Sequence, residues 1–184
     1  MITKRITEAD KSLVDFTRRC DIMGYNNNNS LKAMKFDWCI ETGGAWFATY
    51  DEEDDIISLS GIHPFKDGYR GLFRGAQLYP RNAGMNRYHM QSHCFYCQMP
   101  LQMEFAGDAP IYVTTNIEND ASGRMSKVDR TFHHLAKYGV VSHVGEEELY
   151  NTLQNVWVLN KEKYTEVRIV GELPISYSSV NIPY

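Results

Sequence analysis

The sequence predicts an α/β domain with a mixed, mainly antiparallel sheet that is flanked by helices. Two runs rich in strand-forming residues, Gly44–Tyr50 and Ile56–His63, stand on either side of the acidic turn Asp51–Asp55, as expected for an antiparallel hairpin. A third run, Leu72–Tyr79, is followed by a glycine-containing turn, a helix and the strand Pro110–Asn116. A strand, helix, strand unit of this kind predicts a parallel pair with a right-handed crossover.

Four further elements complete the first half of the predicted fold. Thr7–Met23 is an amphipathic helix with Thr7 as its expected cap. Leu31–Ile40 is either a second short helix or an irregular connector. Phe65–Gly71 is a second turn, and a long helix begins near Met85. The first half of the chain is thus expected to contain three strands and two helices, with Leu31–Ile40 as a possible third helix.

The second half alternates in the same way after the buried strand. A helix spans about Asp120–Tyr138 and ends at Gly139, which is typical of a glycine C-cap. Two late strands follow, Val140–Val144 and Leu153–Leu159, and Glu146–Thr152 forms a short helical or turn link between them. These strands are expected to extend the same sheet.

Length, composition and charge limit the class of protein. A chain of 184 residues with 43% hydrophobic content can bury one substantial core, so we expect one domain over 1–184, with 167–184 as a C-terminal strand and tail. The net charge of -4 argues against nucleic-acid binding. No apolar run approaches the roughly 20 residues that span a bilayer, and Met1–Asp10 lacks a signal-peptide pattern. We therefore expect a cytoplasmic protein with no membrane partner and four reduced cysteines.

The turn Arg81–Asn86 is the strongest candidate for a cofactor site. It contains Gly84 and opens the predicted helix. The first N–H groups of a helix have no internal partners and the macrodipole is positive there, so phosphate or pyrophosphate binds well at such a position. The alternative is an ordinary strand-to-helix turn.

Three local matches connect this order of elements to a known family. W-F-A-T-Y, the acidic turn and I-I-S-L-S-G-I are similar to its second and third strands. Arg81–Asn86 is similar to its pyrophosphate loop, Q/R-x-x-G-x-G/A, with Asn86 where the family prefers Gly or Ala. I-Y-V-T-T-N followed by Asn119 is similar to its fifth strand and next helix start. Over roughly Ile2–Asn160 the chain resembles a divergent member of the GNAT superfamily of acetyl-CoA-dependent N-acyltransferases.

The resemblance implies a cofactor, acetyl-CoA, and an amine acceptor that is a small molecule or a peptide. Homodimers are common among similar proteins. On the acceptor side, the expected residues are Arg74, Gln77 and Asn116. The residues expected to bind coenzyme A are Leu78, Tyr79, Arg81, Asn82, Ala83, Gly84, Met85, Asn86, Asn119 and Ser122.

The chemistry requires a base for the ammonium proton, and an acid for the departing thiolate. His63, Glu41 and His89 are the candidate bases, and each is otherwise a surface or half-buried polar residue. The family's acid is a tyrosine about four residues before Gly139. This chain has Leu135 there, and Tyr138, His133 and His134 are close in sequence, with Tyr138 as the candidate acid.

Two other functions are compatible with the sequence. The departures at Asn86 and Leu135 favour a GNAT-like module that has lost catalysis and serves in binding or interaction. The four-residue spacing of His89, His93 and Cys97 would also line one helical face for zinc. Zinc sites usually take ligands from two elements, and no second pair is evident, so we predict no metal.

Overall fold

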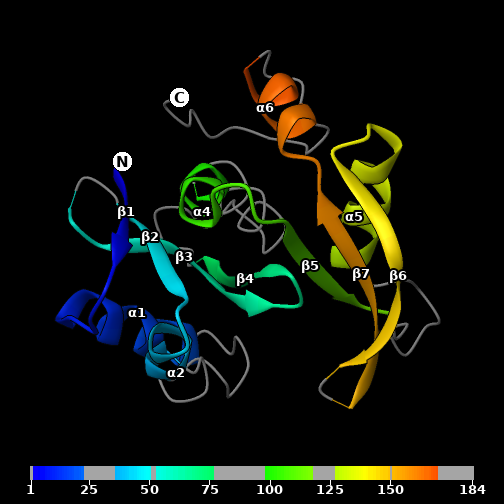
Figure 1. The fold of residues 1–184 in the computed structure, drawn as a ribbon. Helices are drawn as coiled ribbons and strands as arrows, with labels where there is room; N and C mark the ends of the chain where they lie inside the picture. The colour runs from blue at the N-terminus through cyan, green and yellow to red at the C-terminus, as the bar shows by residue number, and fades with distance from the viewer. Residues whose placement is uncertain are drawn as a thin grey trace. The chain divides into compact units, whose positions relative to one another are not determined.

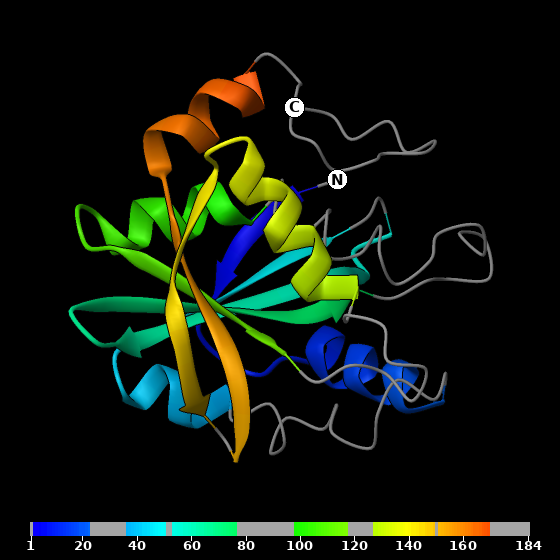
Figure 2. The same ribbon diagram turned by 90° about the vertical axis from the view of Figure 1, so that its right-hand side faces the viewer.

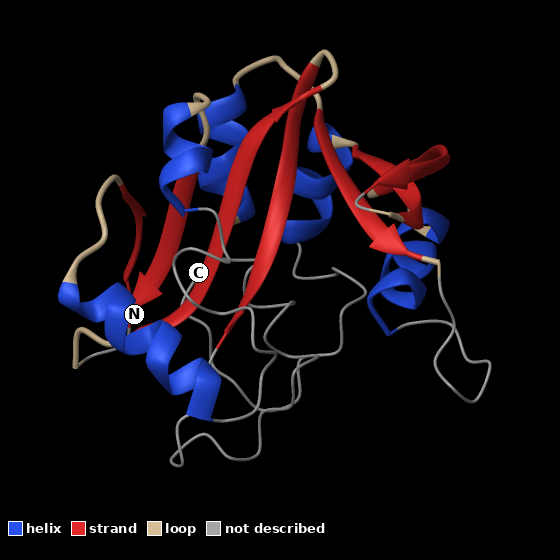
Figure 3. Ribbon diagram, turned by 90° about the horizontal axis from the view of Figure 1, so that it is seen from below, coloured by secondary structure: helices blue, strands red, loops and turns tan. Residues whose placement is uncertain are grey.

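The computed structural model describes residues 2–22, 36–50, 53–76, 98–117, 127–149 and 151–169, and the remaining residues are drawn in grey in Figure 3. The described strands form a seven-stranded sheet in the order β1-β2-β3-β4-β5-β7-β6. It is mainly antiparallel, with one parallel pair, β4–β5, and helices flank it, which confirms the predicted fold class. Contacts divide the chain into two units. The first contains Met1–Pro64 and Gly71–Gly107, and the second contains Phe65–Arg70 and Asp108–Ser176.

Three strands of the first unit pair side by side. They are β1 (Ile2–Ile6), β2 (Ala45–Tyr50) and β3 (Ile56–Phe65). The pairing of β2 with β3 is antiparallel, which confirms the predicted hairpin. The sequence reasoning missed β1, which pairs antiparallel with β2 from the other side.

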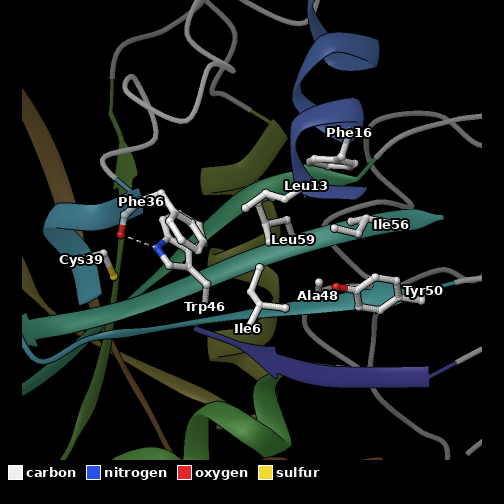
Figure 4. Close-up of a cluster of buried hydrophobic side chains, with 10 residues drawn as sticks. All are labelled: Ile6, Leu13, Phe16, Phe36, Cys39, Trp46, Ala48, Tyr50, Ile56 and Leu59. Atoms are coloured by element: carbon white, nitrogen blue, oxygen red, sulfur yellow. Dashed lines mark hydrogen bonds between the residues drawn. The ribbon is translucent and has the colours of Figure 1, made fainter. Parts of the chain in front are cut away.

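Helices cover both faces of these strands. Because side chains alternate along a strand, neighbouring residues of β2 meet different helices. Phe47 lies 6.4 Å from Phe105 of α4 (Met99–Ala106), ring centre to ring centre. Trp46 stacks at 5.7 Å on Phe36 of α2 (Phe36–Glu41), on the face that α1 (Lys11–Ile22) also covers (Figure 1). The buried cluster on that face is Ile6, Leu13, Phe16, Phe36, Cys39, Trp46, Ala48, Tyr50, Ile56 and Leu59 (Figure 4).

The boundaries in this part of the chain differ from the prediction in two places. The first helix begins at Lys11 and is capped by Asp10, whose Oδ1 accepts from the Leu13 N–H at 2.8 Å. The predicted cap at Thr7 is therefore wrong. The predicted turn Phe65–Gly71 is also too long, because β3 runs to Phe65 and β4 (Gly68–Ala76) begins at Gly68. Leu31–Ile40 is described only from Phe36, where it is helical.

The second unit holds the parallel pair and the late strands. The strand β5 (Ile111–Asn116) lies parallel to β4, with Tyr69 opposite Ile111 and Arg70 opposite Tyr112, as predicted. It pairs antiparallel with β7 (Thr152–Leu159), which pairs antiparallel with β6 (Val141–Leu149). Helix α5 (Lys127–Lys137) packs against β5 and β6 (Figure 2).

Helix α5 ends as the sequence predicts, at a glycine. Gly139 has φ +72° and its N–H bonds the Ala136 carbonyl at 3.0 Å, while the Val140 N–H bonds the Leu135 carbonyl at 3.1 Å. These two bonds form a Schellman motif, in which glycine takes the left-handed conformation at low cost.

The late link is predicted wrongly, and the predicted C-terminal strand does not begin at Val167. Glu146–Thr152 is not a separate link, because most of it is paired strand and the chain reverses at Asn151, which has φ +62°. Residues 167–169 belong to α6 (Lys161–Ile169) and are not strand. The rest of the predicted tail lies outside the described residues.

Candidate functional site

Helix α2 is fixed against β2 and β3 by close contacts from its buried side. The Cys39 thiol donates to the Ile62 carbonyl at 3.3 Å. The Trp46 indole N–H donates to the Phe36 carbonyl at 3.3 Å (Figure 4). Gly44, just after the helix, lies so close to β3 that a Cβ atom there would be 2.3 Å from the Ile62 carbonyl oxygen. The position of α2 is therefore set by tertiary contacts with the end of β3.

These contacts place Trp38 beside His63 on the outer side of α2. The two rings meet edge to face, with centroids 5.3 Å apart. Trp38 is 43% exposed, whereas the chain's other two tryptophans, Trp46 and Trp157, are 0% and 1% exposed. Trp38 is thus the tryptophan that a ligand in solution can reach.

His63, a predicted catalytic base, is buried at 4% exposure and anchored at one nitrogen. Its Nδ1 lies 2.8 Å from the Pro64 carbonyl oxygen. A carbonyl only accepts hydrogen bonds, so Nδ1 carries the proton in this contact. In the neutral ring Nε2 is then the basic nitrogen.

Glu41, the second predicted base, lies on the same helix. It is exposed and follows Trp38 by three residues, a spacing that puts two side chains on the same side of a helix. The structure therefore gathers Trp38, Glu41 and His63 at α2 and the end of β3. We call these three residues the α2–β3 patch.

Other predicted site residues belong to the second unit. Tyr138, the candidate acid, is 49% exposed and meets His134 edge to face at 5.1 Å. Leu135, at the family's tyrosine position, is 1% exposed. Asn116 is exposed at the end of β5.

The predicted cofactor loop lies largely outside the residues that the structure describes. This holds for Gln77, Leu78, Tyr79, Arg81–Asn86, Asn119 and Ser122, and for the predicted histidine and cysteine face of His89, His93, Cys94 and Cys97. Arg74 is in β4, but its side chain is outside the description. Among the described residues, no group of three or more His, Cys, Asp or Glu is placed to hold a metal ion.

Sequence reasoning missed two residues in the described parts of the chain. Trp38 stands in D-W-C-I-E, where a large aromatic side chain between acidic residues is a recognisable signal. Arg70 lies in the parallel pair, is 9% exposed and donates to the Thr114 hydroxyl. A single arginine in a strand gives no sequence signal for such burial.

A buried carboxylate connects the elements of the second unit. Asp129 of α5 is 1% exposed and accepts from the hydroxyl of Thr115 in β5 and from the Asn155 amide of β7 at 2.9 Å. The Trp157 indole N–H donates to the Thr115 hydroxyl at 2.8 Å. The exposed His133 lies 3.3 Å from the other oxygen of Asp129. This network fixes α5 on the sheet.

Tyr50, Tyr112 and Lys161 have perturbed pKa values, and these three are not among the predicted site residues. Burial raises the pKa of Tyr50, and the nearby carboxylates of Asp10 and Asp54 add to the effect. The hydrogen bond to Asp67 is the main cause of the raised pKa of Tyr112. Burial lowers the pKa of Lys161, and the negative charge of Asp108 offsets part of this shift. These shifts report local packing.

The helices in the described parts of the chain all fall short of the length and apolar character that crossing a lipid bilayer requires.

Comparison with known proteins gives matches at the level of structure alone. No protein-family model matches the chain, and no curated protein does. An aminoglycoside 6'-N-acetyltransferase from Enterococcus faecium matches with TM-score 0.53 and 13% identity, over 86% of this chain and 96% of that one. An aminoglycoside 6'-acetyltransferase type Ii matches with TM-score 0.55 and 14% identity, over the same shares of each chain.

A third match is spermidine N-acetyltransferase from Vibrio cholerae, solved with CoA and spermine. Its TM-score is 0.52 at 10% identity, over 89% of this chain and 98% of that one. The predicted resemblance to N-acetyltransferases of the GNAT type is therefore confirmed as a shared fold.

Proposed function

We propose that this protein is an N-acyltransferase that moves an acetyl group from acetyl-CoA directly to a primary amine. The observation that supports this most is the shared fold, which extends over 86% of the chain. This chain's own sheet is mainly antiparallel with the parallel pair β4–β5. The Vibrio cholerae neighbour was solved with CoA. The acceptor is a small-molecule or peptide amine.

The proposed cofactor contacts follow from the sequence motif. The backbone N–H groups of Arg81–Asn86 bind the pyrophosphate of coenzyme A at the start of a helix. Asn119 and Ser122 contact the cofactor arm, and Leu78 and Tyr79 supply backbone donors to the acyl carbonyl.

The transfer needs one proton acceptor and one proton donor. The ammonium group of the acceptor loses one proton to the base, and its neutral nitrogen attacks the thioester carbon. As the C–S bond breaks, the nitrogen loses a second proton and the thiolate takes up one, so the products are the amide and the free thiol. His63 Nε2 is the proposed base, because the Pro64 carbonyl holds the proton on Nδ1. Glu41 is the alternative base, and Tyr138 is the proposed donor to the thiolate.

Calorimetry with coenzyme A tests the donor. We expect saturable heat, and the absence of heat and of a thermal shift at millimolar ligand would contradict the proposal. Turnover is then followed as free thiol released from acetyl-CoA with a panel of amines.

His63→Asn tests the base while its amide N–H can still donate to the Pro64 carbonyl. General-base catalysis contributes about 10²- to 10⁴-fold, so kcat should fall by about that factor while coenzyme A still binds. His143→Asn, at an exposed histidine of β6, is the matched control and should retain activity. Equal kcat for His63→Asn and the wild type at every pH would exclude His63 as the base.

A non-catalytic binding module of the same fold is the second candidate. The buried Leu135 favours it, because a hydrocarbon side chain at 1% exposure stands where the family has its acid. Coenzyme A binding together with slow thiol release for every amine would support this alternative.

A further inference from the structure

The α2–β3 patch combines an accessible aromatic ring with negative charge. Trp38 is 43% exposed, and its indole is held in place by contact with the buried ring of His63. Glu41 lies on the same side of α2, and Asp37 precedes Trp38 in the same helix. Both carboxylates are exposed. The six residues of α2 contain two acidic side chains and no basic one.

Such a combination recognises a cation. The face of an indole attracts an ammonium group through its quadrupole, and tryptophan is the best side chain for this interaction. A carboxylate on the same helix face adds direct charge attraction. The net charge of the chain, -4, has the sign that favours approach of a cation.

We propose that the α2–β3 patch binds an ammonium group of the acyl acceptor, and that the acceptor is a small molecule with at least two amino groups. This inference rests on the proposed function. The amine that attacks a thioester must be uncharged at its nitrogen, so the group that acetyl-CoA modifies is not the one held as a cation. Trp38 and Glu41 therefore hold a second amino group of the same molecule, which leaves His63 as the base for the attacking amine.

Trp38 also supplies the signal for a direct binding test. The other two tryptophans are buried, so a ligand on the patch changes the fluorescence of one exposed indole. The probe is 1,4-diaminobutane, titrated without coenzyme A, and the uncharged 1,4-butanediol is its isosteric control. We expect a saturable change with the diamine alone, and loss of that change in Trp38→Phe.

Charge variants show whether the signal reports this patch. Glu41→Gln should weaken diamine binding about two- to fivefold, which corresponds to the loss of one attractive contact near the surface. Glu104→Gln removes an exposed carboxylate from α4 and should leave the binding curve unchanged. No saturable signal at millimolar diamine, or equal affinities for Glu41→Gln and Glu104→Gln, would overturn the inference.

Kinetics give a second readout. With acetyl-CoA present, Trp38→Leu should raise KM for 1,4-diaminobutane about three- to tenfold and leave KM for n-butylamine unchanged, since that monoamine has no second amino group. An equal rise for both amines would contradict recognition of a second ammonium.

The two proposals can fail separately. Heat with coenzyme A but no diamine signal would overturn the cation site and leave the acyltransferase proposal standing. A diamine signal without coenzyme A heat would support the site and contradict the proposed function.

Discussion

Removal of the Asp129 carboxylate should be among the most damaging single changes in the second unit. Asp129 is 1% exposed and accepts from the Thr115 hydroxyl and from the Asn155 amide at 2.9 Å. In Asp129→Ala both donors stay buried and lose this acceptor. A hydrogen bond to a charged group contributes about 1.5–3 kcal/mol, so two of them predict a loss of about 3–6 kcal/mol in the free energy of unfolding.

Urea denaturation followed by circular dichroism measures this loss. For a chain of this size the melting temperature should fall by about 10 °C, at roughly 2–4 °C per kcal/mol. Asp108→Ala, at an exposed aspartate of the same unit, should stay within about 0.5 kcal/mol of the wild type.

A double-mutant cycle measures the coupling free energy between Asp129 and Thr115. Asp129→Asn and Thr115→Val, alone and combined, should give a coupling of about 1 kcal/mol or more, because the two side chains share a buried hydrogen bond. A loss below 1 kcal/mol for Asp129→Ala at an unchanged m-value would refute the reasoning that this network fixes α5.

Three further predictions concern packing and charge. Tyr50→Phe should leave stability unchanged or raise it by about 1 kcal/mol in urea denaturation, because Tyr50 is buried and no described residue bonds its hydroxyl; a loss of several kcal/mol would contradict this. Gly44→Ala should destabilise by more than about 2 kcal/mol in the same assay, since its Cβ would lie 2.3 Å from the Ile62 carbonyl oxygen, and wild-type stability would show that the approach is looser. Tyr112 has a raised pKa, mainly through its bond to Asp67, so its contribution to stability is complete below about pH 10 and is lost as pH rises through the folded pKa. Tyr112→Phe should flatten that decline, and an unchanged slope would argue against the bond.

The elements that the sequence predicts well are those with a strong apolar pattern or a glycine stop. The hairpin, the strand β5 and the end of α5 at Gly139 are of this kind. The sequence does not predict the strand β1, because Lys4 and Arg5 are exposed in I-T-K-R-I. A charged edge strand lacks the apolar alternation of an inner strand.

The late strand β6 and helix α6 were misread for related reasons. In β6 the run Glu146–Glu148 has low strand propensity, yet its backbone pairs with β7 and its side chains reach solvent. In α6 the segment around Val167 contains β-branched residues, which favour a strand by propensity alone. The contacts of the helix override that weak preference.

The candidate site depends still more on contacts between distant residues. A helix of six residues is far too short to be stable alone, so α2 exists because Cys39 and Phe36 are buried against β2 and β3. The sequence shows that Trp38 and Glu41 are close along the chain. It does not show that the ring of His63, more than twenty residues later, meets the indole edge to face. Only the close approach at Gly44 and the long-range bonds of α2 bring that ring there, and with it the surface proposed to hold a cation.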